Sequence, residues 1–288
     1  MDQYAHDADL LDLDWSAPMT ISRRPLLLGA AVAAGTLAAT ALPASAAAAA
    51  GASRSGPKPT VVLVHGAFAD ASSWSAVASR LQKAGYPVVA PANPLRGLIK
   101  DAAYLTALLA TIEGPKVVVG HSYGGAVISQ ATAGDASVKA LVYVAAFMPD
   151  KGEQLGELAA RFPGSQLGDA LQPLPDGAGG TDLAIQTAKF HAVFTADLPV
   201  ATSALMGASQ RPISAAAFTD AATAAAWRDI PSWAVVAAQD RAIAPDLERF
   251  EAKRAGSHTT VVDSSHVAMV SHPDLVTKVV KSAATATC

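Results

Sequence analysis

Cysteine is almost absent from this chain, which has a single one, Cys288, at the last of its 288 positions. One terminal cysteine allows no intramolecular disulfide, no thiolate metal cluster and no cysteine nucleophile in a folded core. Charge of one sign is also lacking, because 21 Lys and Arg stand against 24 Asp and Glu, for a formal net charge of −3. No basic cluster stands out, so the composition argues against a nucleic-acid surface.

Long hydrophobic runs are few as well, and the N-terminal region comes nearest to one. Arg23 and Arg24 precede an Ala- and Gly-rich apolar run that ends at Leu42 and is followed by a small-residue site at 44–46. This order is the layout of an export signal, and the Arg pair resembles the twin-arginine type. A proline after the Arg pair and an acidic start depart from that type. The run is at the short limit for a membrane anchor. We therefore expect a cleaved export signal at 1–46, secretion or delivery to the cell envelope, and no stable membrane association afterwards.

Strand-like and helix-like segments alternate over much of the remaining chain. Residues 47–59 form an Ala-, Ser-, Gly- and Pro-rich linker, and the folded domain is expected at 60–288. Apolar, β-branched runs predict strands at residues 60–64, 87–90, 116–119, 138–147, 233–237 and 259–262. The segments between them predict helices at residues 74–84, 98–112, 125–133, 246–255 and 273–284. Such alternation predicts an α/β fold with a doubly wound, mostly parallel sheet.

The alternation stops between two of the expected strands. Residues 149–230 are rich in Gly, Pro and Ala and contain helical pieces, at residues 154–161, 182–195, 199–208 and 215–227. A stretch of roughly eighty residues is too long for a loop of a compact domain, so we expect a helical cap inserted over the active face. Four aromatic residues are candidates for the pocket wall, although packing inside the cap explains each equally well: Phe162, Phe190, Phe194 and Trp227.

The most informative motif is Gly-x-Ser-x-Gly at residues 120–124, directly after the expected strand at 116–119 and before a small-residue helix. A strand, a very tight turn and a helix form a nucleophile elbow, in which the glycines avoid clashes and the serine hydroxyl is exposed at the end of the sheet. The alternative is a glycine-rich turn whose serine only caps the helix. With the partners described next, the motif predicts Ser122 as a nucleophile.

A serine nucleophile needs a base to take its proton, and the base needs an orienting carboxylate. Asp240 follows the expected strand at 233–237, and His266 follows the one at 259–262. Catalytic loops gather at the carboxyl ends of parallel strands. The chain order Ser122, Asp240, His266 is also the order that accompanies the elbow in this fold. These three residues are the predicted catalytic set.

Other acids and histidines compete for these roles. Asp150 follows the preceding strand, where some enzymes of this architecture keep their acid, but it also reads as the entry to the insert. Asp263 is better explained as a turn cap. His272, which precedes a proline, reads as a helix-entry residue, and His258 as a surface residue that opens the last strand.

An acyl-transfer site also needs two donors for the developing oxyanion. One is expected to be the backbone N–H of Tyr123, at the positive end of the elbow helix. The other is expected to be the N–H of Ala67, because glycine at position 66 lets the backbone turn toward the site. An ordinary strand-end turn is the alternative for this loop. No metal-ligand spacing occurs, and we expect neither a metal nor an organic cofactor.

Together these segments resemble an α/β-hydrolase, in the style of the branch that contains small-ester methylesterases and plant cofactor-independent hydroxynitrile lyases. The resemblance rests on residues 62–68, 73–74 and 120–125, on Asp240 and on residues 265–266. It runs from the first expected strand to the last helix, with almost no specific motif in the cap. It implies the α/β-hydrolase fold and a serine hydrolase that acts on a small-molecule ester.

Two positions depart from the lyases of that branch. Those enzymes typically carry a threonine where this chain has Gly66, and a lysine directly after the catalytic histidine, where this chain has Val267. Both departures favour ester hydrolysis over cyanohydrin cleavage. Two further hypotheses stay open, namely C–C or C–X bond cleavage on the same fold and a non-catalytic binding protein that retains the triad as a pocket.

Overall fold

The structure is a computed structural model, and it describes residues 58–288. The predicted export signal at 1–46 and most of the linker at 47–59 lie outside the described residues, so both stay predictions. Among residues 58–288, no helix combines the length and the apolar character needed to cross a bilayer.

A six-stranded sheet forms the centre of the described region, and all its neighbouring strands are parallel. Its strand order is β2-β1-β3-β4-β8-β9. The strands are β1 (Thr60–Val64), β2 (Val88–Val89), β3 (Lys116–His121), β4 (Val138–Val144), β8 (Ser232–Ala237) and β9 (His258–Val262). Every residue of β3 and β8 is buried. Their unbroken apolar runs follow from this burial, because a parallel strand in the middle of a sheet has no solvent-facing side.

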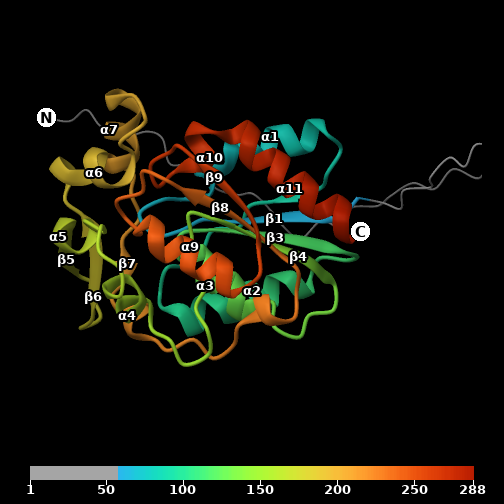
Figure 1. Cartoon of the computed structure of the whole chain (residues 1–288). Helices are drawn as coiled ribbons and strands as arrows, with labels where there is room; N and C mark the ends of the chain where they lie inside the picture. Colours follow the sequence, from blue (N-terminus) through green and yellow to red (C-terminus); the bar gives the residue numbers. More distant parts are fainter. Residues whose placement is uncertain (1–57) are drawn as a thin grey trace, which may run out of the picture. The chain divides into compact units, whose positions relative to one another are not determined.

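Helices cover both faces of this sheet (Figure 1). One face carries α1 (Ser75–Lys83), α10 (Ala268–Ser271) and α11 (Pro273–Thr287), preceded by the short 3-10 helix η1 (Ala71–Trp74). The other face carries α2 (Leu98–Ala110), α3 (Tyr123–Ala131) and α9 (Pro245–Arg254). The predicted doubly wound, mostly parallel α/β fold is thereby confirmed.

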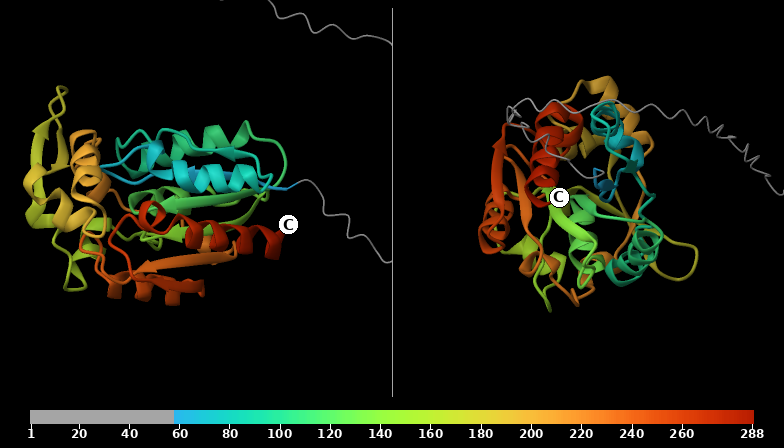
Figure 2. Two further views of the ribbon diagram at one scale, coloured as in Figure 1. Left: turned by 90° about the horizontal axis from the view of Figure 1, so that it is seen from above. Right: turned by 90° about the vertical axis from the view of Figure 1, so that its right-hand side faces the viewer.

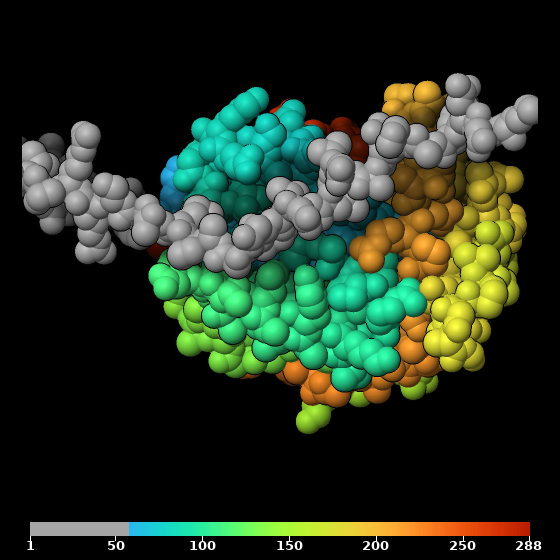
Figure 3. All heavy atoms as spheres, turned by 180° about the vertical axis from the view of Figure 1, so that it is seen from behind, coloured from blue at the N-terminus to red at the C-terminus, as the bar shows by residue number. Residues whose placement is uncertain are grey.

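Most of the segment between β4 and β8 forms a layer beyond one end of the sheet, which Figures 2 and 3 show in yellow-green to orange. Its elements are α4 (Leu155–Ala160), α5 (Leu167–Ala170), β5 (Leu171–Pro175), β6 (Thr181–Ile185), α6 (Thr187–Phe194), α7 (Val200–Ala208), β7 (Ile213–Ser214), α8 (Ala216–Thr219) and η2 (Ala226–Arg228). We call this layer the cap. It lies where the sequence predicted an insert.

The cap contains helices, as expected, but it also contains a three-stranded antiparallel sheet in the order β5-β6-β7, which the sequence analysis did not predict. Asp176 closes the hairpin between β5 and β6, since its Oδ1 accepts the N–H groups of Ala178 and Gly180 at 2.8 Å each. The prolines at 173 and 175 are tolerated because β5 is an edge strand. Residues 182–185 were expected to be helical, and the pairing of β6 with β5 and β7 makes them a strand.

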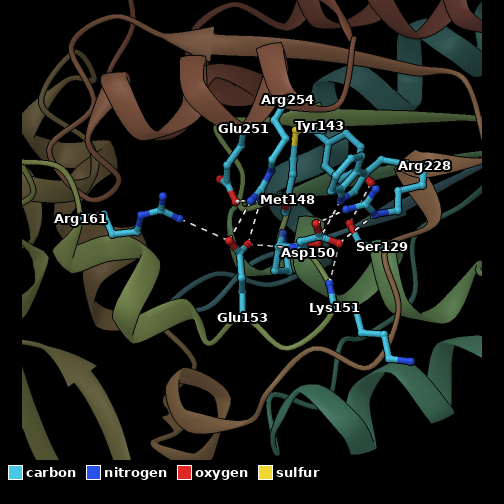
Figure 4. A network of polar contacts seen from close by, with 12 residues as sticks. Ser129, Tyr143, Met148, Asp150, Lys151, Glu153, Arg161, Arg228, Glu251 and Arg254 are labelled. Carbon is cyan, nitrogen blue, oxygen red and sulfur yellow. Dashed lines mark hydrogen bonds and ion pairs between the residues drawn. The ribbon is translucent and has the colours of Figure 1, made fainter.

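Helix α9 holds the root of the cap, at residues 148–153. The N–H of Met148 donates to Glu251 Oε1 at 2.9 Å, and Arg254 Nη2 donates to the Met148 carbonyl at 2.9 Å. Arg254 also pairs with Glu153 at 2.8 Å (Figure 4). One core helix thus fixes the point at which the chain leaves the sheet for the cap.

Candidate active site

Ser122 occupies the tight turn between β3 and α3, with φ 54° and ψ −124°. A Cβ at Gly120 would lie 2.6 Å from the Gly124 carbonyl oxygen, and one at Gly124 would lie 2.6 Å from the Val64 carbonyl oxygen. Both positions therefore require glycine for close backbone approach. A left-handed φ at a serine is costly and marks a backbone that its surroundings hold in place. The residues around Ser122 have the geometry of the predicted elbow.

The structure brings Asp240 and His266 together. His266 Nδ1 lies 2.6 Å from Asp240 Oδ2, and both side chains are buried. The other carboxylate oxygen, Oδ1, accepts the N–H groups of Ala242 at 2.6 Å and Ile243 at 3.0 Å. The carboxylate thus fixes the imidazole with its Nδ1–H toward Asp240. The free ring nitrogen, Nε2, is buried and has no hydrogen-bond partner within the described residues.

His266 also lies beside the elbow. The neighbour of the serine, His121, donates its Nε2–H to the His266 carbonyl at 3.0 Å, and the two rings have centroids 4.6 Å apart. Burial lowers the pKa of His121 well below its usual value, so its ring stays neutral. The sequence analysis gave His121 no role. The structure shows that its ring joins the elbow to the loop that carries His266.

The competing residues have other partners. Asp150 accepts a hydrogen bond from Arg228 Nε at 2.9 Å, and this contact lowers the pKa of the Asp150 carboxyl. His272 stands at the N-cap of α11 and donates to the Asp263 carbonyl at 3.1 Å. His258 is exposed and packs on the Trp233 ring. Among the acids weighed from the sequence, Asp240 is the one that contacts His266.

The loop after β1 lies against the nucleophile. A Cβ at Gly66 would lie 2.7 Å from Ser122 Cβ, so glycine is needed here for close approach. The backbone of Gly66 is not in the left-handed region, so the requirement for glycine comes from this close approach and not from its φ. Within residues 58–288, the N–H groups of Ala67 and Tyr123 donate no hydrogen bond. The two predicted oxyanion donors are thus free on the segments that flank Ser122.

His65 fixes this loop, a role that the sequence analysis missed. Its Nδ1–H donates to the Gly66 carbonyl at 2.8 Å, and its Nε2 accepts the N–H of Asn93 at 2.9 Å. Burial lowers the pKa of His65, which keeps the ring neutral and able to do both. The cap contributes as well, because the Phe68 N–H donates to the Arg211 carbonyl at 3.1 Å.

Of the four cap aromatics, Phe194 contacts the candidate site. Its ring centroid lies 4.8 Å from that of His266 and 6.1 Å from that of Phe68. The others pack elsewhere: Phe190 behind Phe194 at 5.1 Å, Phe162 on Phe250 at 5.4 Å, and Trp227 with its Nε1–H on the Pro149 carbonyl at 3.0 Å. Periodicity within the cap could not separate these roles, because all four are apolar and at least partly buried.

The side chain of Tyr123 is bound to α2. Its hydroxyl donates to Asp101 Oδ2 at 2.6 Å, and Asp101 also accepts the Arg96 N–H at 2.9 Å. Burial, and after it the negative charge of Asp101, raise the pKa of the phenol. Tyr123 can therefore serve the site through its backbone amide, while its ring anchors α3 to α2.

Comparison with known proteins agrees with this architecture. A family model described as the Alpha/beta hydrolase family matches residues 61–279. The alpha/beta hydrolase nvfD of Aspergillus novofumigatus is 28% identical over 251 residues, which cover 79% of this chain and 97% of that protein. A carbendazim hydrolyzing esterase of a Nocardioides species is 31% identical over 143 residues, 40% of this chain and 59% of the esterase. The structure of polyneuridine aldehyde esterase superposes with a TM-score of 0.68 at 20% identity, covering 78% of this chain and 98% of that one.

Proposed function

Because the chain belongs to the alpha/beta hydrolase family, we propose that it hydrolyses a carboxylic ester through an acyl-enzyme on Ser122. The contact between His266 Nδ1 and Asp240 Oδ2, 2.6 Å long and buried, carries this proposal. It leaves Nε2 as the basic nitrogen of the ring. The esterase named among the relatives, which hydrolyses carbendazim, supports ester chemistry.

The proposed reaction has two halves. Ser122 Oγ attacks the carbonyl carbon while His266 Nε2 takes its proton, and the N–H groups of Ala67 and Tyr123 stabilise the negative oxygen. The imidazolium then protonates the departing alcohol, leaving an ester of Ser122. In the second half His266 takes a proton from water, which attacks the acyl carbon. The tetrahedral intermediate formed by this attack then collapses, which releases the carboxylic acid, and His266 returns the proton to Ser122 Oγ.

Two observations weigh against cyanohydrin cleavage, the alternative reaction on this fold. A side chain at position 66 would collide with Ser122, so the threonine of the resembling lyases has no room here. Val267 is completely buried at the start of α10, and a lysine there would place a charge among apolar neighbours. Positions 66 and 267 therefore suit a site that works without the threonine and the lysine of the lyases.

The test is covalent labelling together with turnover. An organophosphonate is expected to add to Ser122, and p-nitrophenyl acetate to be hydrolysed at a rate that Ser122→Ala lowers by at least about 10⁴-fold. Ser129→Ala is the matched control, because Ser129 is a buried serine of α3 that bonds the Tyr143 hydroxyl at 2.8 Å. A wild-type protein that neither labels nor hydrolyses simple esters would leave the lyase or the binding-protein hypothesis standing.

A further inference from the structure

Two glutamates of α9 are buried one turn apart, and they face different parts of the molecule. Glu251 is fully buried and accepts the Met148 N–H at the root of the cap (Figure 4). Glu248 is 3% exposed, and its Oε2 accepts the N–H of Ala237 at 3.0 Å. Ala237 ends β8, and its carbonyl accepts the N–H of Asp240 at 3.3 Å. Glu248 therefore contacts the turn that carries the candidate triad acid.

Asp240 is the charged neighbour that most raises the pKa of Glu248, and its carboxyl group also acts on that pKa as a side-chain hydrogen-bond partner. The second oxygen of Glu248, Oε1, is buried and has no hydrogen-bond partner in the described part of the chain. Two carboxylates cannot be placed side by side in a buried site without severe repulsion, so such a pair holds one proton. The question is which of the two residues keeps it.

The hydrogen-bond donors around each carboxyl group decide this. Asp240 accepts two backbone N–H groups, from Ala242 and Ile243, and also faces the His266 imidazole. Glu248 accepts one backbone N–H, from Ala237. Donors stabilise the charged form, so the negative charge stays on Asp240 and the proton on Glu248.

We propose that Glu248 is a positioning residue of the triad, a neutral carboxylic acid that donates a hydrogen bond to Asp240. Burial raises the pKa of Glu248 well above its usual value, and the charge of Asp240 adds to this effect. The groups that face it are Asp240 with His266 beyond it, and Glu251 on its own helix. Since a carboxylate that accepts a further hydrogen bond is less basic, Glu248 tempers the hold of Asp240 on the imidazolium. This role rests on the proposed function, but the protonation itself does not.

Three variants separate this role from plain packing. Glu248→Gln keeps the shape and a donor, so kcat and the pH profile of kcat/KM are expected to stay within about twofold of wild type. Glu248→Leu keeps the volume but removes the donor. Without that hydrogen bond Asp240 is more basic and holds the imidazolium more firmly, so the acid limb of its profile is expected to move to higher pH. Glu251→Gln alters the other buried acid of α9, which contacts the cap root, and is expected to leave the profile in place.

Infrared difference spectroscopy tests the proton directly and needs no turnover. In the Glu251→Gln background at pH 7, the carbonyl band of a protonated carboxylic acid is expected to disappear when Glu248→Gln is added. A band that persists would assign the proton elsewhere and overturn the proposal. A Glu248→Leu profile that overlays that of the wild type would overturn it as well. If Glu248→Leu fails to fold, the infrared comparison of Glu251→Gln with and without Glu248→Gln still tests the proposal. If the protein shows no esterase activity but the band still disappears when Glu248→Gln is added, then Glu248 is protonated as proposed and only the proposed function is refuted.

Discussion

A side chain at position 66 would take up space that the Ser122 side chain already occupies. The clash would extend to the backbone, because the same Cβ would lie 2.9 Å from the His121 carbonyl oxygen. The loop cannot easily withdraw, since the His65 ring and Asn93 hold it by hydrogen bonds. Gly66 therefore sets how near the Ala67 amide comes to the carbonyl group that Ser122 would attack.

Gly66→Ala is expected to push this loop away from Ser122 and to weaken one oxyanion donor. The loss of one such donor typically lowers kcat about 10²- to 10³-fold. KM is expected to change little, because the donor acts mainly in the transition state. Steady-state kinetics with p-nitrophenyl acetate measure both constants. Gly168→Ala is the control, since a Cβ there meets no atom within 4 Å. A Gly66→Ala variant with wild-type kcat would rule out Ala67 as a donor.

At the scale of elements, α9 shows that a sequence pattern can predict a helix without predicting which of its acidic side chains are buried. The sequence pattern predicts a helix at residues 246–255, and the structure has it at Pro245–Arg254. Nothing in that pattern distinguishes the two buried acids, Glu248 and Glu251, from the solvent-facing one, Asp246. Their burial depends on which turn of the helix faces β8 and the cap root, and that is settled by distant parts of the chain.

Glu251 makes the stability of the fold depend on pH. Burial raises the pKa of Glu251 to about 8, against 4.5 for an ordinary glutamate. The folded state thus binds more protons than the unfolded state between these two values, and the free energy of unfolding falls as the pH rises through that range. At 1.36 kcal/mol per pH unit, the upper limit of this loss is about 5 kcal/mol.

Glu251→Gln is expected to remove this dependence while keeping an acceptor for the Met148 N–H. Its melting temperature relative to wild type is expected to rise from pH 5 to pH 8 and to level off above. Calorimetry in a series of buffers measures the difference. A difference that stays constant from pH 5 to pH 9 would contradict a protonated Glu251.

At the scale of the whole molecule, the sheet and the candidate triad were predictable and the cap was only partly so. The strands were found because β-branched runs such as 60–64 are local signals, and the order Ser122, Asp240, His266 follows from where strands end. The β5–β6 hairpin was not predicted because residues 181–185 become a strand by pairing with residues 171–175 and 213–214. The contact of Phe194 with His266 escaped for the same reason, since it joins segments far apart in the sequence.

The cap and the core also meet at Asp197, between α6 and α7. Its carboxylate accepts the hydroxyls of Ser264, at 3.0 Å, and Ser265, the neighbour of His266. Burial raises the pKa of Asp197, but the hydrogen bonds from the hydroxyls outweigh this effect and leave the pKa lowered.

Asp197→Ala removes these hydrogen bonds and is therefore expected to lower the free energy of unfolding at pH 7. The loss is expected to be only about 1 kcal/mol, because the carboxylate is exposed to solvent. The substitution is also expected to lower kcat/KM severalfold, since the cap and its Phe194 then lie less firmly on the His266 loop. Denaturant titration and ester kinetics measure the two effects. Asp176→Ala is the control, because Asp176 bonds only within the exposed cap hairpin. Equal loss of activity in both variants would show that the cap acts through its own folding and not through this contact.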